Sequence, residues 1–92
     1  MGRTPVGEPL NVPIGTIEKN TREDIRVTLT EFKGTQFADV RVYAGFLATA
    51  DHVRGPTKAG VAVPFERLAE FVRTLQAAEA KARELGLIGG AA

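Results

Sequence analysis

Basic and aromatic side chains alternate with aliphatic ones through residues 25–44, and these residue types can bind nucleic acid. The candidate residues of this segment are Arg26, Thr28, Thr30, Phe32, Lys33, Arg41 and Tyr43. Aromatic rings stack on bases while arginine and lysine contact phosphates, which is how many proteins bind single strands with little sequence preference. The segment therefore predicts a binding surface, provided that one element brings these side chains to the same side.

A β-hairpin is the element that would do so. Aliphatic residues take the intervening positions, which are Ile25, Val27, Leu29, Ala38, Val40 and Val42. Because successive side chains of a strand point to opposite faces, each half of the segment has one aliphatic face and one polar, aromatic face. The β-branched and aromatic content favours strands. The Lys33-Gly34 pair suits the turn between them, since glycine readily reaches positive φ.

Two further strands flank the hairpin in the sequence. The first is predicted over residues 14–19, with two isoleucines as its apolar anchors. The other is predicted over residues 58–63, where valines alternate with small residues and Lys58 adds a basic side chain to the polar side. Residues 45–57 break the alternation, which predicts a loop or a loop with a short irregular strand.

A single long helix is predicted over residues 64–85. Pro64 is favoured at the first helical position, and Gly86 is a typical C-terminal stop. One apolar stripe at helical spacing consists of Phe65, Leu68, Val72 and Leu75. We expect this stripe to cover the aliphatic face of the sheet.

The helix also carries a heptad-like seam in which apolar and small residues alternate by three and four positions. Its members are Leu68, Phe71, Leu75, Ala78, Ala82 and Leu85. Such a seam suits contact with a second helix, and a chain of 92 residues buries only a modest core alone. A homodimer is therefore expected, with Phe71, Leu75, Ala78 and Ala82 at its interface. The alternative is that alanine serves only as a good helix former on a solvated face.

The composition indicates one small soluble domain without catalytic chemistry. The net charge is +1, and cysteine is absent, which excludes disulfides and cysteine-based zinc sites. The chain has no serine either, and its one histidine, His52, stands in the irregular segment. We expect no enzyme activity, no metal and no cofactor. No apolar run near 18 residues is present, so a cytoplasmic protein is expected, nucleoid-associated if bacterial. The predicted organisation is a flexible tail over residues 1–13, one domain over 14–86 and a tail over 87–92.

The polar face also has a structural interpretation that needs no ligand. On that interpretation it is an ordinary half-solvated side of a sheet. Phe32 then packs on the neighbouring strand, and Arg41 pairs with Asp39 or Glu31. Pattern alone leaves both interpretations open.

Three motifs together resemble a known family. They are FKG at residues 32–34, DVRVY at residues 39–43 and PTKAGVAVP at residues 56–64. Their order and spacing resemble the single-strand DNA-binding domain of the transcriptional coactivator positive cofactor four and its bacterial, stand-alone relatives. The resemblance covers about residues 14–82. It implies an α+β fold, a curved four-stranded antiparallel sheet followed by one C-terminal helix (ββββα), paired as a homodimer.

The resemblance also implies roles for individual residues on the sheet face. Phe32 would stack on bases with Lys33 beside it at the backbone, Arg41 would face phosphates, and Lys58 would be the basic residue entering the last strand. Tyr43 matches the family's aromatic in the second hairpin strand. The sequence departs from the family at Ala44, Thr35, Thr30 and Ala59, where a second aromatic and several basic residues are expected. Arg26, Arg54 and Phe46 are candidates to compensate for the missing aromatic ring and cations.

The first hypothesis is therefore a homodimeric, sequence-tolerant single-stranded DNA-binding protein in transcription regulation or DNA maintenance, with the transcription machinery as a candidate partner. The second is a protein-interaction module of the same fold. The third is an RNA-binding protein, because stacking on a sheet does not read the 2′-hydroxyl.

Overall fold

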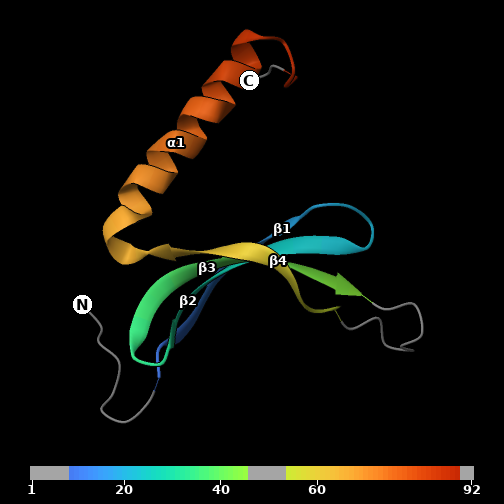
Figure 1. Ribbon diagram of the computed structural model, residues 1–92. Coiled ribbons are helices and arrows are strands. Elements are labelled where there is room, and N and C mark those ends of the chain that lie inside the picture. The colour runs from blue at the N-terminus through green and yellow to red at the C-terminus, as the bar shows by residue number, and fades with distance from the viewer. Residues whose placement is uncertain (1–8, 46–53, 90–92) are drawn as a thin grey trace.

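The computed structural model describes residues 9–45 and 54–89, which form one sheet and one helix (Figure 1). The elements in chain order are β1 (Asn11–Glu18), β2 (Glu23–Phe32), β3 (Thr35–Gly45), β4 (Arg54–Pro64) and α1 (Phe65–Glu84). The strands lie in the order β1-β2-β3-β4, each antiparallel to its neighbour. The predicted ββββα order is confirmed.

The central hairpin has the predicted turn, and its register keeps the predicted faces together. Ile25, Val27 and Leu29 of β2 lie opposite aliphatic residues of β3, and the polar residues lie opposite one another. Both turn residues have positive φ, 53° at Lys33 and 82° at Gly34. Two successive positive φ values define the type of turn whose twist matches that of the flanking strands. The hairpin therefore keeps its aliphatic and polar residues on separate faces, as predicted.

Strand β1 begins at Asn11 rather than Ile14, so the predicted start of the first strand is wrong by three residues. The register shifts between Pro13 and Gly15, which marks a bulge at Ile14. Proline has no N–H to donate and is tolerated in a strand at the edge of a sheet, and β1 is such an edge. The proline-rich composition therefore led to the prediction of a tail where the first three residues of the strand lie.

Strand β4 begins at Arg54 rather than Lys58, so the end of the predicted loop is part of the sheet. A shift in its register with β3 falls between Arg41 and Tyr43. The Thr57 hydroxyl supports this irregularity, because it donates to the Val42 carbonyl (2.8 Å) and accepts from the Ala59 N–H (3.1 Å). His52 and the predicted short strand over residues 46–48 lie outside the described residues.

The helix agrees with its prediction to within one residue at each end. Pro64 is the N-cap, one position before the first helical residue. Gly86 has a φ of 76°, and the N–H groups of Gly86 and Leu87 donate to carbonyls of the last turn. A glycine in the left-handed region ends helices in this way.

The apolar stripe of the helix does not cover the aliphatic face of the sheet in one chain. The prediction that it would do so is wrong. The helix contacts the sheet near its first turns and then extends away from it (Figure 1). Val72 and Leu75 remain exposed, while Ala38 and Val63 are the fully buried apolar residues of the described chain. The radius of gyration is 16.2 Å, against about 12 Å for a compact domain of this length. One chain therefore leaves much of its apolar surface uncovered.

Candidate nucleic-acid interface

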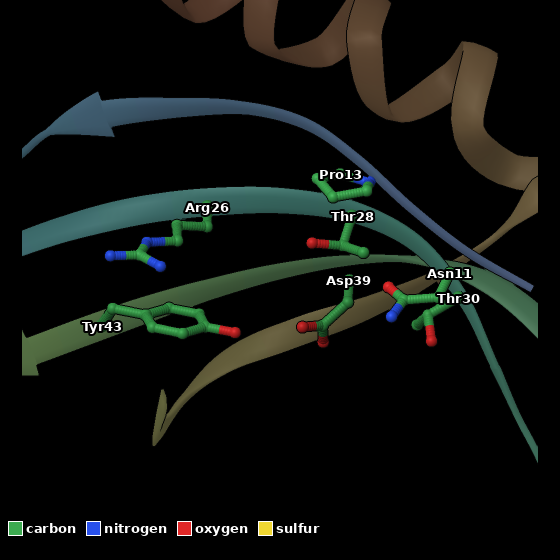
Figure 2. A pocket seen from close by; sticks show the side chains of 7 residues that line it. All are labelled: Asn11, Pro13, Arg26, Thr28, Thr30, Asp39 and Tyr43. Atoms are coloured by element: carbon green, nitrogen blue, oxygen red, sulfur yellow. The ribbon is translucent and has the colours of Figure 1, made fainter. Parts of the chain in front are cut away.

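The predicted binding residues of β2 and β3 share one side of the sheet, which we call the polar face. Its cross-strand neighbours are Asp24–Tyr43, Arg26–Arg41, Thr28–Asp39 and Thr30–Phe37. The strands bend around several of these side chains, and the helix lies on the other side of the sheet (Figure 2). The polar face is therefore concave and not covered by the helix.

At one end of the polar face, Arg26 is fixed between a carboxylate and an aromatic ring. Its Nε donates to Asp24 Oδ1 at 2.8 Å, and its guanidinium carbon lies 4.2 Å from the centre of the Tyr43 ring. The hydrogen bond from Arg26 lowers the pKa of Asp24, against the opposing effect of burial and with further help from Arg54. Cation–π contact and the ion pair together hold the guanidinium plane in place.

Arg54 joins three parts of the chain at the same end. Its Nη1 lies 2.9 Å from Asp24 Oδ2 and 3.3 Å from Glu18 Oε2, and its Nη2 donates to the Thr21 carbonyl at 3.0 Å. These contacts tie the start of β4 to the end of β1 and to the following turn. Arg54 thus has a structural role, and its predicted contact with nucleic acid stays a prediction.

Arg41 lies in the middle of the polar face and is held from two sides. It makes a two-point contact with the Asp39 carboxylate, at 2.8 and 3.1 Å, and its Nη1 donates to the Thr57 carbonyl at 2.9 Å. The structural interpretation predicts that Arg41 pairs with Asp39 or Glu31, and the pairing with Asp39 is confirmed. The Asp39 hydrogen bond raises the pKa of Arg41.

Gly60 allows this placement of Arg41. A Cβ atom at Gly60 would lie 2.6 Å from the Val40 carbonyl oxygen and 3.1 Å from the Arg41 guanidinium carbon. A carbon atom and a carbonyl oxygen at 2.6 Å would overlap, and the closely packed sheet leaves little room for either atom to move away. Glycine at this position therefore lets the arginine cross β4.

At the other end of the polar face, Phe32 projects at the hairpin tip. Its exposed fraction is 65%, so the expectation that it packs on the neighbouring strand is wrong. The Lys33 ammonium lies 5.3 Å from the centre of the Phe32 ring. This end of the face presents an uncovered aromatic ring and a cation, whereas the opposite end is locked by ion pairs.

Lys33 and Lys58 differ from the arginines in their surroundings. Both are exposed, and neither has a carboxylate partner within the described ranges. Lys58 lies in the irregular stretch of β4 beside the polar face. Their charges are available to a ligand.

A hollow of about 310 Å³ lies between the two ends of the polar face (Figure 2). Its lining residues are Asn11, Pro13, Arg26, Thr28, Thr30, Asp39 and Tyr43. Asn11 and Pro13 were assigned to the tail in the sequence analysis. Both residues pair with threonines of the polar face, ahead of the register shift in β1. A proline-rich sequence gives no clear indication of such a strand.

The predicted interface residues of the helix lie away from the polar face. Phe71 and Ala82 are half-buried, whereas Leu75 and Ala78 are exposed. Their role in a dimer stays a prediction. Within residues 9–45 and 54–89, no group of three or more metal-ligating side chains converges. No helix in these ranges is long and apolar enough to cross a membrane.

The fold of this chain, a four-stranded antiparallel sheet followed by one C-terminal helix, matches solved structures of a PC4 (positive cofactor four) homolog. The chain is similar to a PC4 homolog from Burkholderia pseudomallei, solved in two crystal forms. The tetragonal form matches with a TM-score of 0.64 and 25% identity, covering 75% of this chain and 97% of that chain. The orthorhombic form matches with a TM-score of 0.65 and 24% identity, covering 76% and 90%.

No family model matches the sequence, and no curated protein matches it significantly. The resemblance inferred from the three motifs is confirmed by the structural comparison, and the chain carries a PC4-like domain of the bacterial type.

Proposed function

We propose that this protein binds single-stranded DNA through the polar face as a homodimer. The observation that carries the proposal is Phe32, an aromatic side chain left uncovered at the tip of the hairpin with Lys33 beside it. The ring is therefore open to a ligand on the polar side of the sheet. Stacking on a base would cover the ring and contributes about 1–3 kcal/mol per base in single-strand binders.

The polar face offers a continuous path for a strand from Phe32 to Tyr43. Phe32 lies eight residue steps along β2 from Asp24, which pairs with Tyr43 across the strands. At about 3.3 Å per step the path is roughly 26 Å long. Arg26 and Arg41 lie between these ends. A strand that follows the path would meet an aromatic ring at each end and cations along it, with bases recognised by shape rather than by sequence.

The phosphate contribution to binding should be moderate. The carboxylates of Asp24 and Asp39 form ion pairs with the arginines of this face, which are Arg26, Arg41 and Arg54. Part of the arginine charge is therefore compensated before any ligand binds. Lys33 and Lys58 are the unpaired cations near the face within the described residues. Because the logarithm of affinity falls by about 0.7 per neutralised phosphate for each tenfold rise in salt, the salt dependence should be that of a few phosphates in each protomer.

Homodimer formation is supported by the apolar surface that one chain leaves open. Ile14, Ile17 and Val61 on the aliphatic side of the sheet, together with Val72 and Leu75 on the helix, are all at least 44% exposed. Apolar surface of this extent on a small protein marks an interaction site. A second copy offers a complementary apolar helix and sheet, so both chains would gain a core.

A role in transcription regulation or DNA maintenance in the cytoplasm or nucleoid follows from this proposal, because both processes expose single strands. No catalytic step is assigned to the protein. RNA is a competing ligand, because stacking of bases on a sheet does not read the 2′-hydroxyl.

The test is fluorescence anisotropy with a labelled single strand of about 20 nucleotides and with duplex and RNA of equal length as competitors. We expect salt-sensitive binding that duplex displaces poorly. The Phe32→Ala, Arg41→Ala double variant should lose binding. The Phe32→Ala single variant should keep its thermal stability and lose about 1–3 kcal/mol of affinity. Arg73→Ala, on the exposed helix, serves as the control. Wild-type affinity in the double variant would contradict the site, and failure to bind at low salt would contradict the function.

A further inference from the structure

Arg26 has a fixed orientation on the polar face. Its guanidinium carbon lies over the Tyr43 ring, 4.2 Å from the centre. Two of its N–H groups donate to the Asp24 carboxylate, from Nε to Oδ1 at 2.8 Å and from Nη2 to Oδ2 at 3.4 Å. A two-point contact in the plane of the guanidinium and a ring against its face together restrict how that plane can turn.

The fixed guanidinium is also open to a ligand. The Arg26 side chain keeps 37% of its surface exposed, and together with Tyr43 and Pro13 it lines the hollow of about 310 Å³ (Figure 2). This volume lies at the lower end of the range for small-molecule sites, about 300–1,000 Å³, so the hollow has room for a planar heterocycle. Unstacked bases lie on guanidinium planes as well as on aromatic rings.

The charges around Arg26 favour a base over a phosphate as its partner. The Asp24 carboxylate is in contact with the guanidinium, and it repels any phosphate that approaches the same group. A base carries no net charge and meets no such repulsion. Lys33 and Lys58 have no carboxylate partner within the described ranges, so phosphates have better positions elsewhere near the face.

We propose that Arg26, held on Tyr43 by Asp24, is a second stacking platform of the polar face, on which one base of a bound single strand lies. This inference rests on the proposed function and assigns Arg26 to the bases rather than to the phosphates. Every base has a π-face, so the platform accepts any base. It therefore adds affinity to the polar face without adding sequence preference.

The two platforms hold different bases of the same strand. Arg26 lies six residue steps along β2 from Phe32, which is roughly 20 Å at about 3.3 Å per step. Bases in direct stacking contact lie only about 3.4 Å apart. A strand bound at both platforms is thus anchored at two separated bases, and the phosphates between them are left to the lysines and to solvent.

The first experiment changes Arg26→Lys, which keeps the positive charge and removes the plane. Anisotropy with a thymine strand of about 20 nucleotides should show affinity at least about fivefold lower, the lower end for one stacked base. The slope of affinity against salt should stay unchanged, because no phosphate contact is lost. Arg73→Lys, the same substitution on the exposed helix, is the control. Wild-type affinity in Arg26→Lys would overturn the platform and leave the proposed function standing.

The second variant, Arg26→Tyr, supplies a flat ring without the charge. Aromatic neighbours on adjacent strands are compatible with a sheet, and thermal melting checks the fold. This variant should bind the thymine strand more tightly than Arg26→Lys does. Binding as weak as that of Arg26→Lys would show that charge and not the plane matters, and would overturn the platform.

A measurement on the wild-type protein tests the contact directly and does not depend on how the variants fold. The Nε–H signal of Arg26 is assigned in NMR spectra by its absence from Arg26→Lys. Saturation with an adenine-only strand should move this signal upfield, because a stacked base shields the protons above its ring. A downfield shift, as expected for a phosphate contact, or an unchanged signal in the bound protein would overturn the platform. Absence of binding to every strand at low salt would overturn the proposed function and this inference with it.

Discussion

On the polar face of the sheet, Asp24 and Asp39 hold Arg26, Arg41 and Arg54 at fixed positions within one chain. No buried side-chain nitrogen or oxygen of the described residues lacks a hydrogen-bond partner. On the opposite face, Ile17 and Val61 of the sheet and Val72 and Leu75 of the helix remain exposed. Among the described residues, the buried polar side chains are thus paired within one chain, whereas several large apolar side chains stay exposed.

This difference has a physical origin. Arginine and aspartate two residues apart on a strand point to the same face, so they meet without any help from the fold. A helix can cover a sheet only if it packs along it, and here it extends away from it after its first turns (Figure 1). The arginines of the polar face are therefore fixed within one chain, and the aliphatic face stays partly open in one chain.

Leu75→Glu should have the largest effect, because it places a charge on the apolar stripe that we assign to the dimer. An uncompensated buried charge costs about 3–5 kcal/mol, which is enough to shift the mass in analytical ultracentrifugation from twice 9.8 kDa to 9.8 kDa. Thermal stability should fall with it. Ala77→Glu adds the same charge on the opposite side of the helix and should change neither quantity. A dimer that survives Leu75→Glu would place the interface elsewhere.

Gly60→Ala should have the next largest effect and act on the polar face. The added methyl group meets the Val40 carbonyl oxygen at 2.6 Å, and forced overpacking costs about 1–3 kcal/mol. Urea denaturation measures this cost. The matched control is Gly15→Ala, where the new Cβ has no neighbour within 4 Å. Because the strain also displaces Arg41, the Gly60→Ala variant should bind single strands less tightly than Gly15→Ala. Equal stability of the two variants would contradict the close approach.

Asp24→Asn should have a smaller and pH-dependent effect, since asparagine keeps one acceptor for Arg26. The pKa of Asp24 is lowered from 3.8 in the folded protein, so its carboxylate adds stability that is fully present above 3.8. That stability is lost as the pH falls through the lowered pKa. The difference in thermal midpoint between wild type and Asp24→Asn should be constant from neutral pH to mild acid and should shrink below 3.8. A difference that grows on acidification would contradict the ion pair.

The central hairpin could be predicted from the sequence because its two-residue alternation and its Lys33-Gly34 turn are local signals. The helix could be predicted for the same reason, from Pro64, Gly86 and the apolar spacing. Strand β1 could not be placed accurately, because Pro13 argues against a strand unless the strand is known to lie at an edge. The direction of the helix depends on tertiary contacts that no local pattern encodes.

The candidate site was predictable as a list of side chains but not as an arrangement. Alternation placed Arg26, Arg41 and Tyr43 on one face, which the register confirms. It did not show that Asp24 would hold two arginines, because Arg54 reaches it from β4, far along the chain. The signal available was the spacing of two between Asp24 and Arg26, repeated by Asp39 and Arg41.

The most direct test of the central claim uses Phe32→Trp, since the chain contains no tryptophan and the new one can be excited selectively over Tyr43. Leu87→Trp, beyond the end of the helix, is the control. Titration with single-stranded DNA should quench the emission of the Phe32→Trp variant and protect it from acrylamide, because a base stacks on the ring. The emission of the control should not change. If anisotropy shows the strand bound while the emission of the Phe32→Trp variant is unchanged, the polar face at the hairpin tip is not the binding surface.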